Sequence, residues 1–86
     1  MSETQSEGNA AVQPLDRLAP GEVGVVVRLD GPAPMIRRMM ELGMVPGTSI
    51  QIVRRAPLGD PIELSVRGVH LSLRRSDARL VHVERR

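Results

Sequence analysis

The segment from Ile62 to Arg75, which reads IELSVRGVHLSLRR, constrains the fold more than any other part of the chain. If Arg67 and Gly68 form a two-residue turn, one face of the flanking strands pairs only apolar residues: Val66 with Val69, Leu64 with Leu71 and Ile62 with Leu73. The other face pairs only polar residues: Ser65 with His70 and Glu63 with Ser72. A shift by one residue would mix the two faces. The sequence therefore predicts an antiparallel hairpin in this register.

Three further strands are expected from runs rich in β-branched residues, at 22–29 (EVGVVVRL), 48–55 (TSIQIVRR) and 80–84 (LVHVE). Gly24 lies in the middle of the first run. A glycine inside a strand indicates a bend, a bulge or the close approach of another backbone. Together with the hairpin, these runs give about five strands.

Between residues 34 and 42 the apolar pattern changes from the period of a strand to that of a helix. Pro34 suits the first turn of a helix, and Gly43 suits its C-terminal cap. A single helical turn is also expected at 76–78. Short strands separated by Gly and Pro turns, with one amphipathic helix after the first strand, predict a mainly β fold. A small barrel is the expected form, since closure would remove exposed sheet edges.

The chain of 86 residues is expected to form one domain over 14–84, preceded by a disordered tail at 1–13. The tail is polar and lacks the basic and apolar regions of a secretory signal. No stretch approaches the ~18 apolar residues that a membrane-spanning helix needs. We therefore expect a cytoplasmic protein with no direct insertion into a membrane.

The composition excludes several functions. Without cysteine there is no disulfide, thiolate metal site or cysteine nucleophile. Without Phe, Trp or Tyr there is no aromatic platform on which nucleic-acid bases could stack. All twelve basic residues are arginines, yet ten acidic residues reduce the net charge to +2. An RNA-binding barrel, which would bind with a steep salt dependence, is the weakest alternative, and no nucleic-acid partner is expected.

No set of residues indicates catalysis. His70 and His82 are the only candidates for a general acid or base near neutral pH. Neither lies in a recognisable frame with a nucleophile, and no Gly-rich phosphate-binding loop is present. The sequence favours a protein that binds a partner over an enzyme.

A metal site is one alternative. His70 and Glu63 are diagonal neighbours across the predicted hairpin, and His82 and Glu84 share one face of the last strand. Such a His/Glu set could bind a first-row divalent ion. The other interpretation is that these four residues are ordinary polar side chains on the outer face of a half-buried sheet.

A partner surface is the second candidate. Met35 and Met40 cannot easily both face inward with the other apolar residues of the predicted helix, so at least one is expected to be exposed. Methionine suits adaptable docking surfaces. We predict a shallow groove between the 34–42 helix and the 56–61 loop, with contacts from Met35, Arg38, Met40 and Leu58.

Several motifs resemble the FeoA family. The helix-to-strand phrase ELGMVPGT begins at Glu41, and the loop-to-hairpin phrase APLGDPIE begins at Ala56. LDRL at 15–18, VRG at 66–68 and LSLRR at 71–75 accompany them. The resemblance covers residues 14–84.

This resemblance implies an SH3-like barrel with a helix inserted after the first strand. It also implies a non-catalytic accessory role in ferrous iron uptake beside FeoB, a membrane Fe²⁺ transporter with a cytosolic GTP-binding domain. The protein would then lie at the inner membrane through that partner. The alternative function is sensing or delivery of Fe²⁺ through His70 and His82. The resemblance supplies no catalytic residues and no secure metal ligands.

Overall fold

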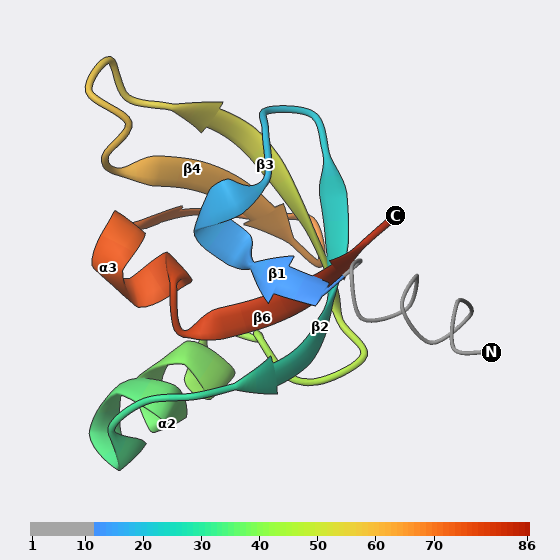
Figure 1. Ribbon diagram of the computed structural model, residues 1–86, viewed down its shortest axis with the longest axis vertical. Helices are drawn as coiled ribbons and strands as arrows, with labels where there is room; N and C mark the ends of the chain where they lie inside the picture. Colours follow the sequence, from blue (N-terminus) through green and yellow to red (C-terminus); the bar gives the residue numbers. More distant parts are fainter. Residues whose placement is uncertain (1–11) are drawn as a thin grey trace, which may run out of the picture.

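The computed structural model describes residues 12–86, so most of the predicted tail, 1–11, lies outside the described residues. The described chain forms six strands and three short helices (Figure 1). The strands are β1 (Val12–Pro14), β2 (Val23–Leu29), β3 (Ser49–Arg55), β4 (Ile62–Val66), β5 (Val69–Leu73) and β6 (Val81–Arg85). The helices are η1 (Leu15–Arg17), α2 (Ala33–Glu41) and α3 (Arg75–Ala78). None of the described helices is long and apolar enough to cross a membrane.

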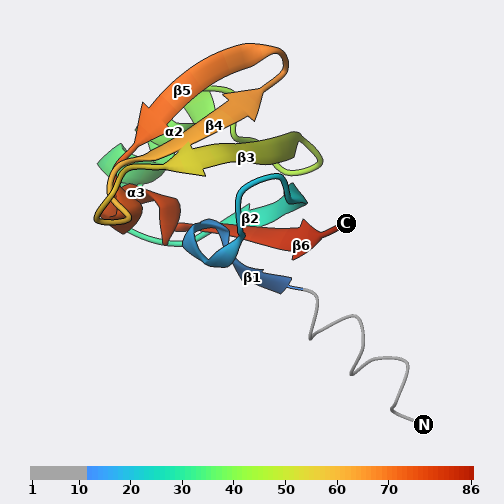
Figure 2. The same ribbon diagram turned by 90° about the horizontal axis from the view of Figure 1, so that it is seen from above.

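The strands form one antiparallel sheet in the order β1-β6-β2-β3-β4-β5. Figure 2 shows the sheet curled over itself, with β3, β4 and β5 on one side and β1, β2 and β6 on the other. The apolar faces meet between these two sides. Because no aromatic residue is available, the core consists of aliphatic side chains and two methionines: Leu15, Leu18, Val26, Met39, Met44, Ile50, Ile52, Ile62, Leu64, Val66, Leu73, Ala78, Val81 and Val83.

The predicted hairpin is confirmed in every pair. β4 and β5 pair Val66 with Val69 and continue without a shift to Ile62 with Leu73. The turn residues Arg67 and Gly68 have φ angles of 53° and 81°. Positive φ at both central residues is the geometry that lets a two-residue turn follow the twist of the strands. The mainly β fold and the helix after the 22–29 strand are confirmed as well.

The strands differ in detail from the expected arrangement of about five. There are six strands, because Val12–Pro14 pairs with β6 and places Gln13 opposite Val83. The first strand thus begins two residues before Pro14, and the last strand reaches Arg85. A three-residue strand is too short to show a period of two, and its final proline is tolerated only because β1 lies at the edge of the sheet.

The expected closure of the barrel is wrong. In the part of the chain that the structure describes, β1 and β5 are the two ends of the sheet, and each pairs with one neighbour only. Figure 2 shows β1 and β5 far apart on opposite sides of the fold. The barrel is therefore curled but keeps two open strand edges, which are places where another chain can add.

Gly24 faces a side chain and not the backbone that was one of the three expectations. A Cβ atom at this position would lie 2.7 Å from Cγ2 of Val83 on the neighbouring β6. The expected bulge occurs two residues later, between Val26 and Arg28. The Val83 side chain therefore packs against β2 at a point where a second side chain would not fit.

Gly24→Ala should therefore destabilise the domain by about 1–3 kcal/mol through overpacking. Chemical denaturation with and without Val83→Ala would measure the effect. The added methyl group and Val83 occupy the same space, so Val83→Ala should cost less in the Gly24→Ala background than alone. Additive losses would contradict this contact.

Candidate interaction surface

α2 presents its side chains to three different surroundings. Met39 is fully buried in the core, Met35 and Ile36 are half-buried, and Met40 is 40% exposed. The helical period causes this division, because the residues beside Met39 in sequence point about 100° away from it. The prediction that Met35 or Met40 is exposed is confirmed for Met40.

One side of α2 borders a groove, which we call the β5 groove. α2 contributes Met35, Arg38 and Leu42 to its wall; the other lining residues are Leu71, Ser72, Leu73, Arg74, Ser76 and Asp77. A second hollow adjoins it, shares Ser72 and Arg74, and reaches Asp60 and Pro61 of the 56–61 loop. The two hollows together lead from α2 across the end of β5 to the loop.

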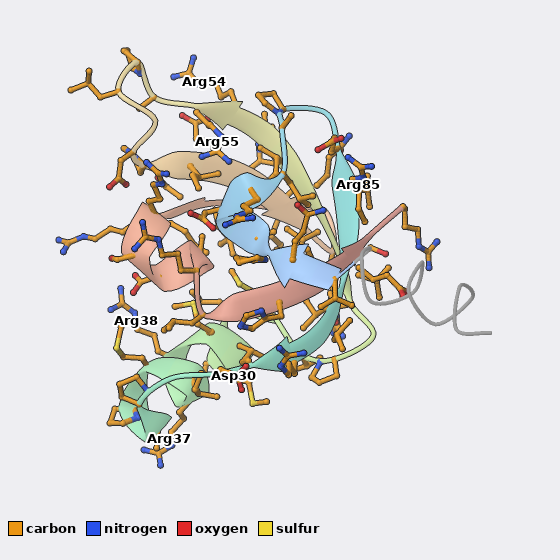
Figure 3. The ribbon with its side chains drawn as sticks, viewed as in Figure 1. Asp30, Arg37, Arg38, Arg54, Arg55 and Arg85 are labelled. Carbon is orange, nitrogen blue, oxygen red and sulfur yellow. The ribbon has the colours of Figure 1, made fainter. Side chains whose placement is uncertain are left out.

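The opposite side of α2 borders a separate depression, which we call the α2 hollow. It is lined by Gly31, Ala33, Ile36, Arg37, Met40 and Glu41. Met40 therefore belongs to a different surface from Met35 and Arg38. Figure 3 shows Arg37 and Arg38 pointing away from each other, as neighbours on a helix must.

The predicted groove between the helix and the loop differs from the one observed. Figure 1 shows α2 and the 56–61 loop at opposite ends of the molecule, with α3 between them. Leu58 is 93% exposed at the loop and lines neither surface of α2. Of the four predicted contact residues, the structure brings only Met35 and Arg38 together.

Leu42, Leu71 and Arg74 line the β5 groove and were not among the predicted contacts. Leu42 is 39% exposed and caps the C-terminal end of α2. Arg74 could be noticed in sequence only as half of a basic pair. What joins it to α2 is the order of the strands, which places the end of β5 beside the helix.

The positive charges of the β5 groove are not neutralised locally. Arg38 and Arg74 have no acidic partner within 4 Å among residues 12–86. By contrast, Arg85 pairs with Glu22 at 3.1 Å. Of the two carboxylates at this end of the groove, Asp60 accepts a hydrogen bond from the backbone N–H of Arg75, and Asp77 is buried. An anionic group entering here would meet two available guanidinium groups.

The four predicted metal ligands do not converge. Glu63 and His70 lie on β4 and β5, whereas His82 and Glu84 lie on β6, with β2 and β3 between them. Glu63 is in an ion pair with Arg54 at 3.1 Å. Within residues 12–86, no group of three or more His, Asp or Glu side chains could hold a metal ion. The described residues therefore do not fit a metal centre built from all four.

His82 has a different neighbour from the one expected. Its Nε2 atom lies 3.3 Å from Oδ2 of Asp30, and Nε of Arg28 lies 2.8 Å from the same oxygen. The carboxylate is thus shared by two side chains of the β2–β6 pair. This arrangement provides one histidine and one carboxylate, fewer than the three or four ligands of a specific site.

A buried polar cluster at η1 was missed by the sequence reading. The Asp16 side chain is only 7% exposed, and its Oδ2 lies 3.4 Å from Nε of Arg75 and 3.5 Å from Nε of Arg79. Arg55 donates hydrogen bonds to the backbone carbonyls of Asp16 and Leu18, the latter at 2.8 Å. An aspartate between two core leucines in LDRL was the available signal. These hydrogen bonds and ion pairs hold η1 against β3 and α3.

Arg55→Met should lower the free energy of unfolding by about 1.5–3 kcal/mol, because a charged donor to two backbone carbonyls is lost. Arg54→Met is the matched control. The two arginines are adjacent, but Arg54 makes one exposed ion pair, worth about 0–1 kcal/mol. Urea denaturation of both variants checks the prediction, and equal losses would contradict it.

The chain was compared with known proteins. A sequence profile described as the FeoA domain matches residues 13–85. A Fe(2+) transport protein A/Fe(2+) transporter FeoB fusion protein of Porphyromonas gingivalis is 39% identical over 70 residues. That match covers 81% of this chain but only 8% of the fusion protein.

Two solved structures agree with this match. A FeoA-like protein from Clostridium acetobutylicum superposes with a TM-score of 0.80 at 36% identity, over 86% of each chain. Stenotrophomonas maltophilia FeoA complexed with zinc, described as a prokaryotic SH3 domain protein, superposes with a TM-score of 0.73 at 32% identity. This match covers 81% of our chain and 87% of that one. The expected SH3-like fold is therefore confirmed, and the chain belongs to the FeoA family.

Proposed function

We propose that this chain is a non-catalytic accessory module of ferrous iron uptake that binds the cytosolic part of a FeoB-type transporter. The observation that carries the proposal is the relative in which Fe(2+) transport protein A and FeoB form one polypeptide. A covalent link holds two domains at an effective concentration that can reach the millimolar range. Such a fusion favours a function that needs the two parts in contact.

We further propose that the β5 groove is the contact surface. Leu42 and Leu71 offer apolar area at a partly open groove, and Arg38 and Arg74 offer charge that no residue of the described chain neutralises. Apolar centres with arginine nearby are typical of protein interfaces. The α2 hollow, which contains the predicted contact Met40, is the competing surface, and the predicted contact Leu58 lies outside both surfaces.

Isothermal titration of the chain into the cytosolic part of its cognate transporter tests the proposed function. Three titrations, without nucleotide, with GDP and with a non-hydrolysable GTP analogue, cover the states of the GTP-binding domain. We expect a Kd of about 10 μM or tighter in at least one state, in the range of transient complexes. The absence of binding in all three states would refute the proposed function.

The alternative function is the sensing or delivery of a divalent metal ion. Because the four predicted ligands do not converge, it would use Glu63 with His70 and, separately, His82 with Glu84. The zinc complex of the Stenotrophomonas maltophilia relative is the observation that favours it. We expect alanine substitutions of His70 and His82 to change Zn²⁺ or Fe²⁺ affinity independently, and calorimetric titration of the two single variants and the double variant measures this. Loss of all metal binding in either single variant would show that the separation is wrong.

A further inference from the structure

We infer that the open edge of β5 receives an extended, acidic segment of a partner protein as an added strand. This inference rests on the proposed function and deepens it, because it names the kind of element that the β5 groove accepts. Within residues 12–86, β5 ends the sheet, and its backbone pairs only with β4.

The hairpin geometry fixes which backbone groups of β5 point outward. In a two-residue hairpin the residues flanking the turn, here Val66 and Val69, exchange both hydrogen bonds, and the pairs then alternate along the ladder. The N–H and C=O groups of His70 and Ser72 therefore face away from β4. Among residues 12–86, no other segment forms a backbone hydrogen bond with either residue.

The neighbours of this edge define the chemistry of its occupant. Leu71 of β5 and Leu42 and Met35 beside it provide an apolar wall, and Arg38 and Arg74 provide two guanidinium groups that have no acidic partner within residues 12–86. Strand addition gives affinity through main-chain hydrogen bonds and specificity through alternate side chains. An extended segment that alternates apolar with acidic residues would pack against the apolar wall, form hydrogen bonds with the strand edge and pair with both arginines.

A second copy of the chain fits the same edge less well. If two β5 edges paired antiparallel with His70 opposite Ser72, Arg74 of one copy would lie beside Arg67 of the other. Like charges would then meet at both ends of the pairing, which opposes association. The other open edge, β1, is a poor template, because it has three residues and ends in Pro14, which lacks an N–H group.

Two variant pairs test the inference. Ser72→Pro removes the outward N–H without removing a β4–β5 hydrogen bond, and Ser72→Ala is its control with the N–H retained. Arg38→Gln with Arg74→Gln removes the unpaired charges. Arg37→Gln with Arg86→Gln is its control with the same change of net charge at a distance from the groove.

Two probes are used with these variants. The first is an array of random linear peptides, and the second is the cytosolic part of the cognate transporter. On the array we expect wild-type protein to select peptides in which Asp or Glu alternates with apolar residues. The best peptide should bind about tenfold more weakly to Ser72→Pro and to the Arg38/Arg74 variant than to wild-type protein. Its affinity for the control variants should stay within about twofold of the wild-type value. Its binding should slow hydrogen exchange at the amides of His70 and Ser72.

The outcomes separate the two proposals. If the transporter binds wild-type protein and both test variants equally, the strand-addition inference is wrong and the proposed function stands. If the transporter does not bind but the array behaves as expected, the proposed function fails and the inference stands. The inference is overturned if the array does not enrich acidic peptides. It is also overturned if hydrogen exchange at the amides of His70 and Ser72 is unchanged. The inference is also overturned if the wild-type protein forms a dimer and Ser72→Pro dissociates it. Should Ser72→Pro not fold, the arginine pair and the exchange measurement decide alone.

Discussion

Replacing Leu64 with alanine should lower the free energy of unfolding by about 2–5 kcal/mol. Leu64 is fully buried in the middle of β4, opposite Ile52 on one side and Leu71 on the other. The neighbours belong to three strands whose hydrogen bonds hold them in place, so they cannot collapse into the cavity. A domain is typically stable by only about 5–15 kcal/mol, and this core contains no aromatic ring to offset the loss.

Leu58→Ala is the matched control for this measurement. It makes the same chemical change at a side chain that is 93% exposed, so its effect should stay within about 0.5 kcal/mol. Thermal and urea unfolding of both variants, followed by circular dichroism in the far ultraviolet, provide the comparison. Similar losses for Leu58→Ala and Leu64→Ala would show that the assignment of the core is wrong.

Met35→Asp should weaken binding of the transporter's cytosolic part at least about tenfold, equivalent to ~1.4 kcal/mol. Met35 lines the β5 groove beside Leu42, and a carboxylate there would lose its hydration when a partner covers the groove. The half-buried position of Met35 leaves room for the new side chain to reach solvent in the free domain.

Met40→Asp distinguishes the two surfaces of α2. It places the same charge on the same helix but in the α2 hollow, so binding should change by less than about twofold if the β5 groove is the contact. Calorimetric titration of both variants, after nuclear magnetic resonance spectra show that each is folded, decides between them. If Met40→Asp weakens binding and Met35→Asp does not, the contact surface is the α2 hollow.

The hairpin was predictable because its information is local. Two strands joined by two residues have one register in which all apolar residues share a face, and Arg67-Gly68 supplies the turn. α2 was equally readable from its period and from Gly43. β1 was not, because three residues cannot show a period and its strand exists only through pairing with β6.

The candidate interaction surface was only half predictable for a related reason. The sequence identified Met35 and Arg38 as available, but it could not show that α3 separates α2 from Leu58. The failure of the four metal candidates to converge has the same origin. The pairs Glu63 with His70 and His82 with Glu84 follow from local strand geometry, whereas their separation follows from the order of six strands. No single segment of the sequence contains the information that sets this strand order.

The most direct test of the central claim is to map the binding surface on ¹⁵N-labelled protein while unlabelled transporter cytosolic part is added. We predict that the largest chemical-shift changes lie at Arg38, Leu42 and along 70–77, which together surround the β5 groove. The amides of Gly31, Met40 and Glu41 at the α2 hollow should change little. Changes centred on the α2 hollow, or at β1 and η1, would contradict the proposal that this FeoA-family domain binds a FeoB-type transporter through the β5 groove.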